Sequence, residues 1–220
     1  MKACFHIHTK YSFDSLMHPK KILKICKQLG ADVVYITDHN TIRGSLEAKK
    51  YEKEIGIKVI LGIEIKTQYG DIIGVNLTEE ILTRDFEEVL DEIKSQGGIS
   101  ILPHPYRGHK KVEYLASKVD LIEVWNGHST PEENQKALEL TVKFRKPPVV
   151  GSDAHLYSEL GNAMMRFNSL FDFEKTFYTT YSKAYQKELS NLIGHIKTGR
   201  VWNIPLVIIR LLGGSALWRE

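Results

Sequence analysis

Five of the nine histidines in this 220-residue chain stand at the ends of runs rich in Val, Ile and Leu. These histidines are His6, His8, His39, His104 and His155. Three carboxylates lie at or beside such ends: Asp14, Glu64 and Asp153. If the runs are neighbouring strands, their ends meet at one edge, and imidazoles with carboxylates are the donor set that binds zinc and other transition metals. The sequence therefore predicts a site for several metal ions.

The pair formed by His6 and His8 shows why the interpretation needs the whole set. Side chains alternate along a strand, so both imidazoles should lie on one face and reach one ion. For this pair alone, two buried histidines bonded to the backbone are an equally good interpretation. The carboxylates shift the balance, because a buried carboxylate is costly unless it is paired or bound to a metal.

Seven short runs have the composition of strands. They are only weakly alternating, which is typical of strands that are buried on both faces. Their ranges are 3–8, 33–37, 58–65, 71–77, 99–102, 120–125 and 148–152.

Helix signals lie between these runs. Pro19 suits a first helical position and Gly30 a stop, and Thr83 can cap a further helix. Thr130 begins a capping box before a helix over 131–145. Strands that alternate with helices predict a parallel sheet with right-handed crossovers.

The predicted fold class is α/β, a distorted seven-stranded (β/α)7 barrel with a C-terminal helical extension. Functional groups at the carboxyl ends of the strands are typical of such barrels. A doubly wound sheet is the alternative, but no G-x-G-x-x-G follows the first strand. We expect residues 1–220 to form a single domain. The barrel and its metal motifs occupy 1–165, and the extension occupies 166–220.

The extension ends in an apolar segment, 204–220. Pro205 and Arg210 interrupt it, and its apolar run is too short to span a bilayer. We expect it to pack on the barrel, with a dimer surface as the alternative. No signal segment opens the chain, and Cys4 and Cys26 resemble small buried hydrophobes. These features predict a cytoplasmic protein with no membrane partner, and they leave the oligomeric state open.

The formal net charge of +3 is only mildly basic. It permits an anionic partner, and a phosphorylated small molecule or a nucleotide is the partner that we expect. A nucleic-acid partner is left open without support from charge, because such a surface needs Lys and Arg clustered on one face.

Six motifs occur in an order that resembles the polymerase-and-histidinol-phosphatase (PHP) superfamily of metal-dependent phosphoesterases. The motifs are HIHTKYSFDS, TDHN, GIEI, HPYR, EVWN and GSDAH, within about residues 3–165. The later string LIGHIKTGRV is similar to the helix that closes many members. The resemblance implies a distorted seven-stranded barrel that holds two or three divalent ions, of Zn, Mn or Fe, at the strand ends.

The resemblance also implies which residues bind each ion. The first ion is assigned His6, His8, Glu64 as a bridge, and Asp153. The second is assigned Asp14, His39 and His155, and the third is assigned His104 with Glu64. Asp38 is expected to orient His39 or a neighbour from outside the ligand set. Many relatives carry a histidine in the strand after the bridging glutamate, where this chain has Asp71 or no ligand, so the third ion is the least secure.

Substrate candidates follow from the same motifs. Arg107 could clamp a phosphate, although a solvated loop arginine is an equally good interpretation. Asn126 could orient substrate or a ligand, or simply form a turn. His128 could be a late ligand or contact substrate. The leaving-group acid could be His155, His128 or a metal-bound water.

The predicted activity is hydrolysis of a phosphate monoester or diester by a hydroxide that bridges two ions. A histidinol-phosphate phosphatase is one alternative, and a 5′–3′ exonuclease or nucleotide phosphatase is another. A PHP module that keeps its metals without catalysis is a third. A related amidohydrolase is disfavoured, because such sites usually need a metal-bridging lysine and only Lys66 lies near a ligand.

Overall fold

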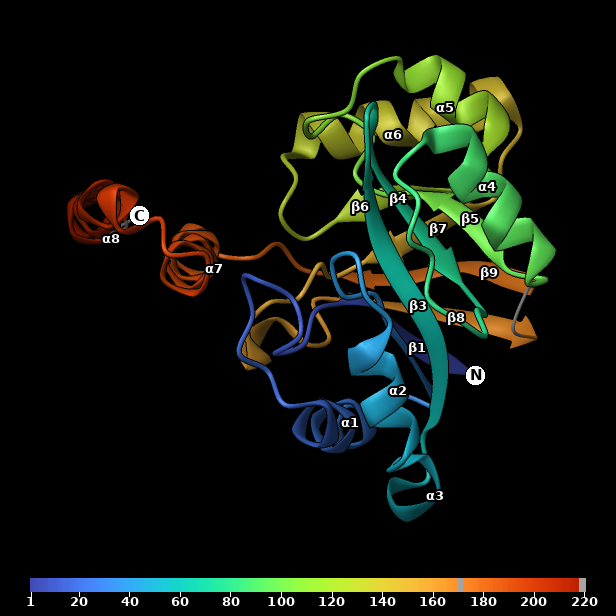
Figure 1. The fold of residues 1–220 in the computed structure, drawn as a ribbon, viewed down its shortest axis with the longest axis horizontal. Coiled ribbons are helices and arrows are strands. Elements are labelled where there is room, and N and C mark those ends of the chain that lie inside the picture. Colours follow the sequence, from blue (N-terminus) through green and yellow to red (C-terminus); the bar gives the residue numbers. More distant parts are fainter. Residues whose placement is uncertain (170–171, 218–220) are drawn as a thin grey trace.

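The computed structural model describes residues 1–169 and 172–217, and at 168–178 and 213–217 it describes the backbone alone. Its strands form one sheet in the order β7-β6-β5-β4-β3-β2-β1-β8-β9 (Figure 1). The strands are β1 Lys2–Ile7, β2 Val33–Ile36, β3 Lys58–Thr67, β4 Gly70–Val75, β5 Ile99–Leu102, β6 Leu121–Asn126, β7 Pro148–Gly151, β8 Ala163–Ser169 and β9 Asp172–Thr179.

Most of the described helices cover the outside of this sheet, and the last two lie to one side of it (Figure 1). The helices are α1 Pro19–Gln28, α2 Arg43–Lys49, α3 Glu52–Ile55, α4 Phe86–Ser95, α5 Val112–Lys118, α6 Pro131–Phe144, α7 Ala184–Lys197 and α8 Ile204–Leu217. Two short 3-10 turns complete the described elements, η1 Tyr157–Glu159 and η2 Val201–Asn203.

The first seven strands form the predicted distorted barrel. It closes where the segment after β7 meets the end of β1, since Ala154 bridges Ile7 in a parallel sense. His8 N donates to Ala154 O at 2.9 Å, and Ala154 N donates to His6 O at 3.0 Å. The predicted α/β barrel is therefore confirmed, and its closing seam brings two of the ligand motifs side by side.

One prediction about the barrel is wrong, because the sheet is not parallel throughout. β4 runs antiparallel to both β3 and β5. Only Gln68 and Tyr69 separate β3 from β4, and a parallel crossover needs a dozen or more residues. As a result, the start of β4, and with it Asp71, lies beside the end of β3 that carries Glu64.

The predicted helical extension begins instead with strands. β8 pairs antiparallel with β1, matching Lys2 to Arg166 and Cys4 to Met164, and β9 pairs with β8. The other edge of β1 would otherwise expose unpaired backbone N–H and C=O groups, and β8 covers them. The helical part starts at α7. Residues 170–171 and 218–220 of the predicted extension lie outside the described residues.

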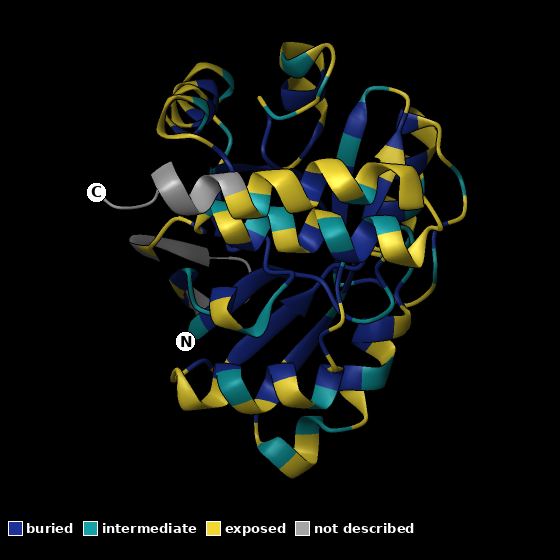
Figure 2. Cartoon of the chain, turned by 90° about the vertical axis from the view of Figure 1, so that its left-hand side faces the viewer, coloured by how far each residue is buried: buried dark blue, intermediate teal, exposed yellow. Residues whose placement is uncertain are grey.

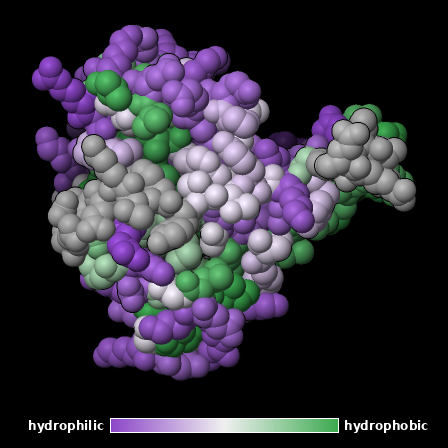
Figure 3. Space-filling view, turned by 180° about the vertical axis from the view of Figure 1, so that it is seen from behind, coloured by the Kyte–Doolittle hydropathy of each residue, from purple (hydrophilic) through white to green (hydrophobic). Residues whose placement is uncertain are grey.

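The expectation that the apolar tail packs on the barrel is wrong for the described part of α8. This helix packs alongside α7, away from the sheet (Figures 1 and 2). Val207 is buried, while Leu206, Ile209 and Leu212 are exposed on the projecting arm, whose hydrophobic surface Figure 3 shows from behind. None of the described helices has the length and apolar character needed to cross a bilayer.

The core lies on both sides of the barrel wall (Figure 2). Phe5, Tyr35 and Phe167 belong to the cluster that also takes in side chains of β4 to β7. Cys4 and Cys26 belong to a second cluster, under α1 and α2, and are free and fully buried as expected.

Two of the three predicted helix starts hold. Pro19 is the first residue of α1, and Thr130 forms the capping box of α6 with Glu133. Thr83 does not cap α4, because Asp85 occupies that position and accepts from the backbone N–H groups of residues 87 and 88. A carboxylate two residues later is the better acceptor for the positive helix end.

We therefore expect Asp85→Ala to destabilise the fold by about 1 kcal/mol, because the first turn of α4 loses its cap. Thr83→Ala is the matched control and should cost less, since Thr83 makes no cap bond to the helix. Urea unfolding followed by circular dichroism measures both. Equal losses in the two variants would contradict this assignment of the cap.

Candidate metal centre

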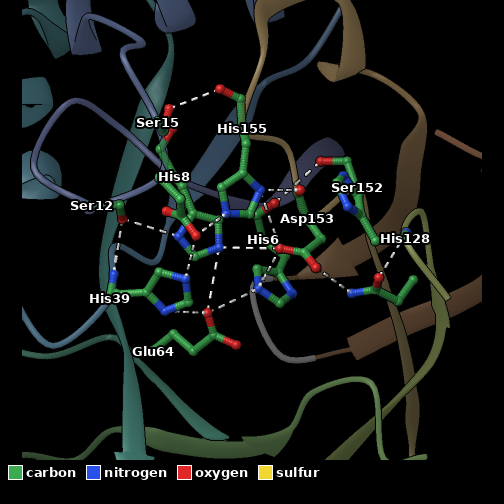
Figure 4. A network of polar contacts seen from close by, with 12 residues as sticks. His6, His8, Ser12, Ser15, His39, Glu64, His128, Ser152, Asp153 and His155 are labelled. Atoms are coloured by element: carbon green, nitrogen blue, oxygen red, sulfur yellow. Dashed lines mark hydrogen bonds and ion pairs between the residues drawn. The ribbon is translucent and has the colours of Figure 1, made fainter. Parts of the chain in front are cut away.

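The eight predicted ligands lie together at one end of the barrel, where β1, β2, β3, β5 and β7 end, and Figure 4 labels all of them except Asp14 and His104. The eight are His6, His8, Asp14, His39, Glu64, His104, Asp153 and His155. Their donor atoms fall into overlapping groups whose members lie within 4.8 Å of one another. The overlap comes from shared side chains, which is the arrangement expected of adjacent ions.

The first group surrounds the ends of β1 and β3. Nε2 of His6 lies 3.3 Å from Oδ1 of Asp153 and 3.5 Å from Oε2 of Glu64. Nε2 of His8 lies 3.2 Å and 3.4 Å from the same two oxygens. Two imidazoles and two carboxylates thus face one point.

The second group lies on the outer side of His8. Oδ2 of Asp14 lies 3.2 Å from Nε2 of His39 and 3.1 Å from Nε2 of His155. The ring of His8 stacks on His155 with centroids 4.1 Å apart. Nδ1 of His39 lies 3.0 Å from Oε2 of Glu64, so this carboxylate oxygen faces both groups.

The third group joins Glu64, Asp71 and His104. Nε2 of His104 lies 3.0 Å from Oε1 of Glu64. The contacts of Glu64 with the other two groups are made by its second oxygen, Oε2. Asp71 is brought here by the antiparallel course of β4. Nε2 of His109 donates to the backbone oxygen of Asp71 at 2.8 Å. A carboxylate thus occupies the place where the resemblance implied a histidine.

The donor atoms at this end of the barrel suit divalent ions, because several of them have no hydrogen-bond partner within the described residues. These buried ring nitrogens and carboxylate oxygens are His6 Nε2, His8 Nε2, Asp14 Oδ1, Glu64 Oε2, His104 Nδ1 and His155 Nε2. A buried polar atom without a partner is costly, and coordination to an ion removes that cost.

Ionisation at the site favours cations. Burial by itself raises the pKa of Glu64, but the imidazoles of His39 and His6 outweigh it and hold this pKa well below its ordinary value. Burial, helped by the neighbouring rings of His155 and His39, lowers the pKa of His8 to about 3. At neutral pH Glu64 is therefore ionised and His8 is neutral, the forms that bind metals. Burial lowers the pKa of His39, but Glu64 and Asp14 outweigh burial and raise this pKa, so a bound cation would displace the proton of His39.

Unusual backbone accompanies three of the ligands. His6, His104 and Asp153 have φ values of 60°, 28° and 52°, in the region that favours glycine. The pairing of β1 with β2 shifts register between Cys4 and Ile7, so β1 is bulged at His6. Such residues cost on the order of 1–3 kcal/mol each and cluster at functional sites. Their strain indicates that the rest of the barrel holds the ligands in place.

An open hollow of about 310 Å³ lies over these groups. Its lining combines six of the ligands with Asp71 and with residues from later in the chain: Arg107, His128, Lys187, Ser190 and Asn191. Its size lies at the lower end of the range found for small-molecule sites.

Arg107 lines this hollow and contacts one of the predicted ligands. Its guanidinium donates to Asp153 and, at 3.1 Å, to Oδ1 of Asn126. Burial raises the pKa of Asp153, but His6 and Arg107 outweigh burial and hold that pKa well below its ordinary value. Guanidinium has five N–H donors, so others stay available to a ligand in the hollow.

Comparison with known proteins gives the family. The family model of the PHP domain matches residues 5–201. The chain belongs to the PHP domain family. Uncharacterized protein MJ1587 of Methanocaldococcus jannaschii is 44% identical over 158 residues, covering 65% of this chain and 92% of that protein. Uncharacterized protein MJ0417 of the same organism is 36% identical over 183 residues, covering 77% and 72%.

A solved structure with a similar fold comes from Bacteroides vulgatus, a two-domain protein containing a predicted PHP-like metal-dependent phosphoesterase. It superposes with a TM-score of 0.63 at 21% identity. The match covers 75% of this chain and 57% of that one, so the PHP domain here spans little more than half of the two-domain protein.

Asn126 and His128, predicted substrate residues of this PHP domain, have different positions. Asn126 is fully buried and bonds to Glu123 and Asp153, so it positions neighbours and does not line the hollow. His128 lines the hollow, and its Nε2 lies 2.8 Å from Oε1 of Glu159.

Asp38 lies behind the ligands, as expected, but acts through a serine. It accepts from Thr9 N at 2.5 Å and from Ser12 Oγ at 2.7 Å. Ser12 Oγ in turn lies 3.1 Å from Nδ1 of His8 and accepts from the backbone N–H of His39 at 3.0 Å. One buried carboxylate thus positions His8 and His39, which belong to the first and second donor groups.

Glu123 was not singled out from the sequence, although it lies in the EVWN motif. Its carboxylate accepts from Nδ1 of His6 at 2.8 Å and from the backbone N–H of His104 at 2.8 Å. A Cβ at Gly151 would lie 1.8 Å from this carboxylate, so only glycine leaves room for it. The signal available in the sequence was a carboxylate within a run of apolar residues. The structure buries this carboxylate, which is only 1% exposed.

Glu159 and Lys187 were also missed. Glu159 accepts from the backbone N–H of His155 at 2.9 Å as well as from His128. Lys187 of α7 donates to the backbone oxygen of His128 at 2.6 Å, and burial together with Arg107 lowers its pKa. Both lie outside the strand-end motifs. Only the folded chain brings Lys187 to the hollow and Glu159 to His128 at its wall.

We expect Glu123→Gln to weaken metal binding by about 10- to 100-fold, because the amide cannot accept from both His6 and His104 as a charged carboxylate does. Isothermal titration with Mn²⁺ or Zn²⁺ measures the affinity. Glu113→Gln is the control, since Glu113 forms an exposed pair with Lys143 and should bind metal as the unaltered chain does. Unchanged affinity in Glu123→Gln would refute its positioning role.

Proposed function

We propose that this chain is a metal-dependent phosphoesterase that hydrolyses a phosphate monoester or diester at a site for two or three ions. The observation that carries the proposal is the position of Glu64 beneath an open hollow, where its carboxylate lies within 3.5 Å of ring nitrogens from all three donor groups. Membership of the PHP family supports the same activity.

We assign the ions to the residues already grouped by geometry. His6, His8, Glu64 and Asp153 would hold the first ion, and Asp14, His39 and His155 the second. Glu64, Asp71 and His104 would hold the third. Mixed nitrogen and oxygen donors suit Zn²⁺, Mn²⁺ or Fe²⁺. The bound ions would supply Lewis acidity, which makes water a stronger nucleophile at neutral pH and offsets the charge of the transition state.

No nucleophile from the protein is needed, and the nearby hydroxyl groups support this. Ser15 Oγ donates to the backbone oxygens of His8 and His155, and Ser152 Oγ donates to those of Phe5 and His6 (Figure 4). Both hydroxyls therefore hold ligand-bearing segments together. Water remains as the attacking group.

The cationic wall of the hollow would bind the phosphate. Arg107 and Lys187 both line it, and each carries donors beyond those that it uses within the protein. Charge-assisted bonds from such groups to phosphate oxygens are stronger than neutral ones. His128, whose Nε2 lies 2.8 Å from Oε1 of Glu159, would give a proton to the leaving group.

The proposal predicts that the chain hydrolyses p-nitrophenyl phosphate or its bis-ester with Mn²⁺, Zn²⁺ or Fe²⁺, and that chelation abolishes turnover. Asp14→Ala and His8→Ala should each lower kcat/KM by at least about 100-fold while the circular dichroism spectrum stays unchanged. Asp91→Ala, an exposed position on α4, is the control and should retain full activity. Full activity of either ligand variant under limiting metal would sink the proposal.

A second prediction concerns the phosphate-binding wall. Lys187→Met should raise KM by about 10-fold with a smaller change in kcat, because it removes a charge that contacts the bound phosphate. Lys183→Met removes a charge from the exposed start of the same helix and serves as the control. Steady-state kinetics at fixed ionic strength measures both, and equal KM values would exclude a role for Lys187 in binding.

A further inference from the structure

A second hollow adjoins the metal centre. It has a volume of about 370 Å³ and lies between the loop after β1 and the helix α7. Its lining is Phe13, Asp14, Asn191, Gly194, His195, Thr198 and Arg200. Asp14 and Asn191 line both hollows, so the two are continuous across a proposed metal ligand. A molecule that places its phosphate at the metals can extend into this second space.

Phe13 forms one wall of the second hollow and is held rigidly there. Its ring stacks on His39 with centroids 4.8 Å apart and an angle of 22° between the planes. The backbone of α7 approaches its edge at Gly194, where a Cβ would lie 3.5 Å from the ring. Nevertheless, 47% of Phe13 is exposed. An aromatic ring fixed on one side and open on the other is a stacking surface.

The α7 side of the hollow is polar, and several of its side chains are available to bind a ligand. Within the described residues, the side chains of Asn191, His195 and Arg200 form none of the observed hydrogen bonds or ion pairs. Arg200 follows the end of α7, and a guanidinium stacks on planar rings as well as donating hydrogen bonds. This wall suits a planar ring that carries hydrogen-bonding groups and does not suit a purely aliphatic chain.

We propose that the second hollow is a leaving-group subsite for a planar aromatic or heteroaromatic ring, which stacks on Phe13 and contacts Arg200. The proposal rests on the phosphoesterase function and narrows its substrate class to phosphate esters of alcohols that bear such a ring. Phe13 is a specificity-determining residue in this scheme, because it touches the leaving group and not the scissile bond.

The test uses two pairs of probes that differ only in the ring. Benzylphosphonate and cyclohexylmethylphosphonate are not hydrolysed, and calorimetry measures their binding to the Mn²⁺-loaded chain. Benzyl phosphate and cyclohexylmethyl phosphate report kcat/KM. We expect the aromatic member of each pair to be preferred by about 10-fold.

Variants separate stacking from support of His39. Phe13→Leu should remove most of the aromatic preference while leaving binding of the cyclohexyl probes within about 3-fold, and Phe13→Tyr should retain the preference. Tyr185→Leu is the matched control, since this aromatic residue of α7 is 46% exposed but lies outside the hollow. It should behave as the unaltered chain does.

Each failure has a distinct meaning. Equal binding of the two phosphonates to the unaltered chain would overturn the ring subsite, even if both phosphates are hydrolysed. Equal losses for both probes in Phe13→Leu would also overturn it and would leave Phe13 as a support for His39. Ring-selective binding without turnover of either ester would uphold the subsite and refute the phosphoesterase proposal.

Discussion

The carboxylate of Glu64 is the constraint around which this molecule is organised. It is 99% buried in the barrel end and lies within 3.5 Å of ring nitrogens from four histidines, His6, His8, His39 and His104. An isolated charge at such a place would be prohibitively costly, so the surrounding imidazoles and the ions that they suit are conditions of its burial. The carboxyl ends of β1, β2, β3 and β5 therefore lie side by side, because histidines at or near the ends of β1, β2 and β5 contact the carboxylate that β3 carries.

The barrel meets this requirement with local departures from regular structure. β1 is bulged at His6, and the backbone is left-handed at His6, His104 and Asp153. β4 turns back against β3 after two residues, which delivers Asp71 to the metal end. A second layer of carboxylates then fixes the ligands, with Asp38 acting through Ser12 and Glu123 acting directly on His6. Strain at the ligands is offset by this layer and by the packed core beneath it.

The helix α7 borders both the candidate metal centre and the second hollow. Its first half places Lys187 and Ser190 over the ligands, and its second half places His195 and the following Arg200 beside Phe13. Lys197 fastens the helix by donating to backbone oxygens of Lys10, Ser12 and Ser15, in the loop that carries Asp14. The position of α7 thus depends on the loop that carries Asp14. In turn, α7 completes the walls of both hollows.

The sequence by itself determined the α/β class, the seven barrel strands and a cluster of eight candidate metal ligands. These follow from composition and from residue types at strand ends, which are local properties. Only the tertiary structure decided the antiparallel course of β4, the strands β8 and β9, and the recruitment of Asp71, Glu123, Glu159 and Lys187. Those features depend on which segments meet in space, and a local pattern carries no information about pairing partners far along the chain. The unpaired edge of β1 is covered by β8. The histidines at the barrel end are hydrogen-bonded or ion-paired by carboxylates such as Glu123.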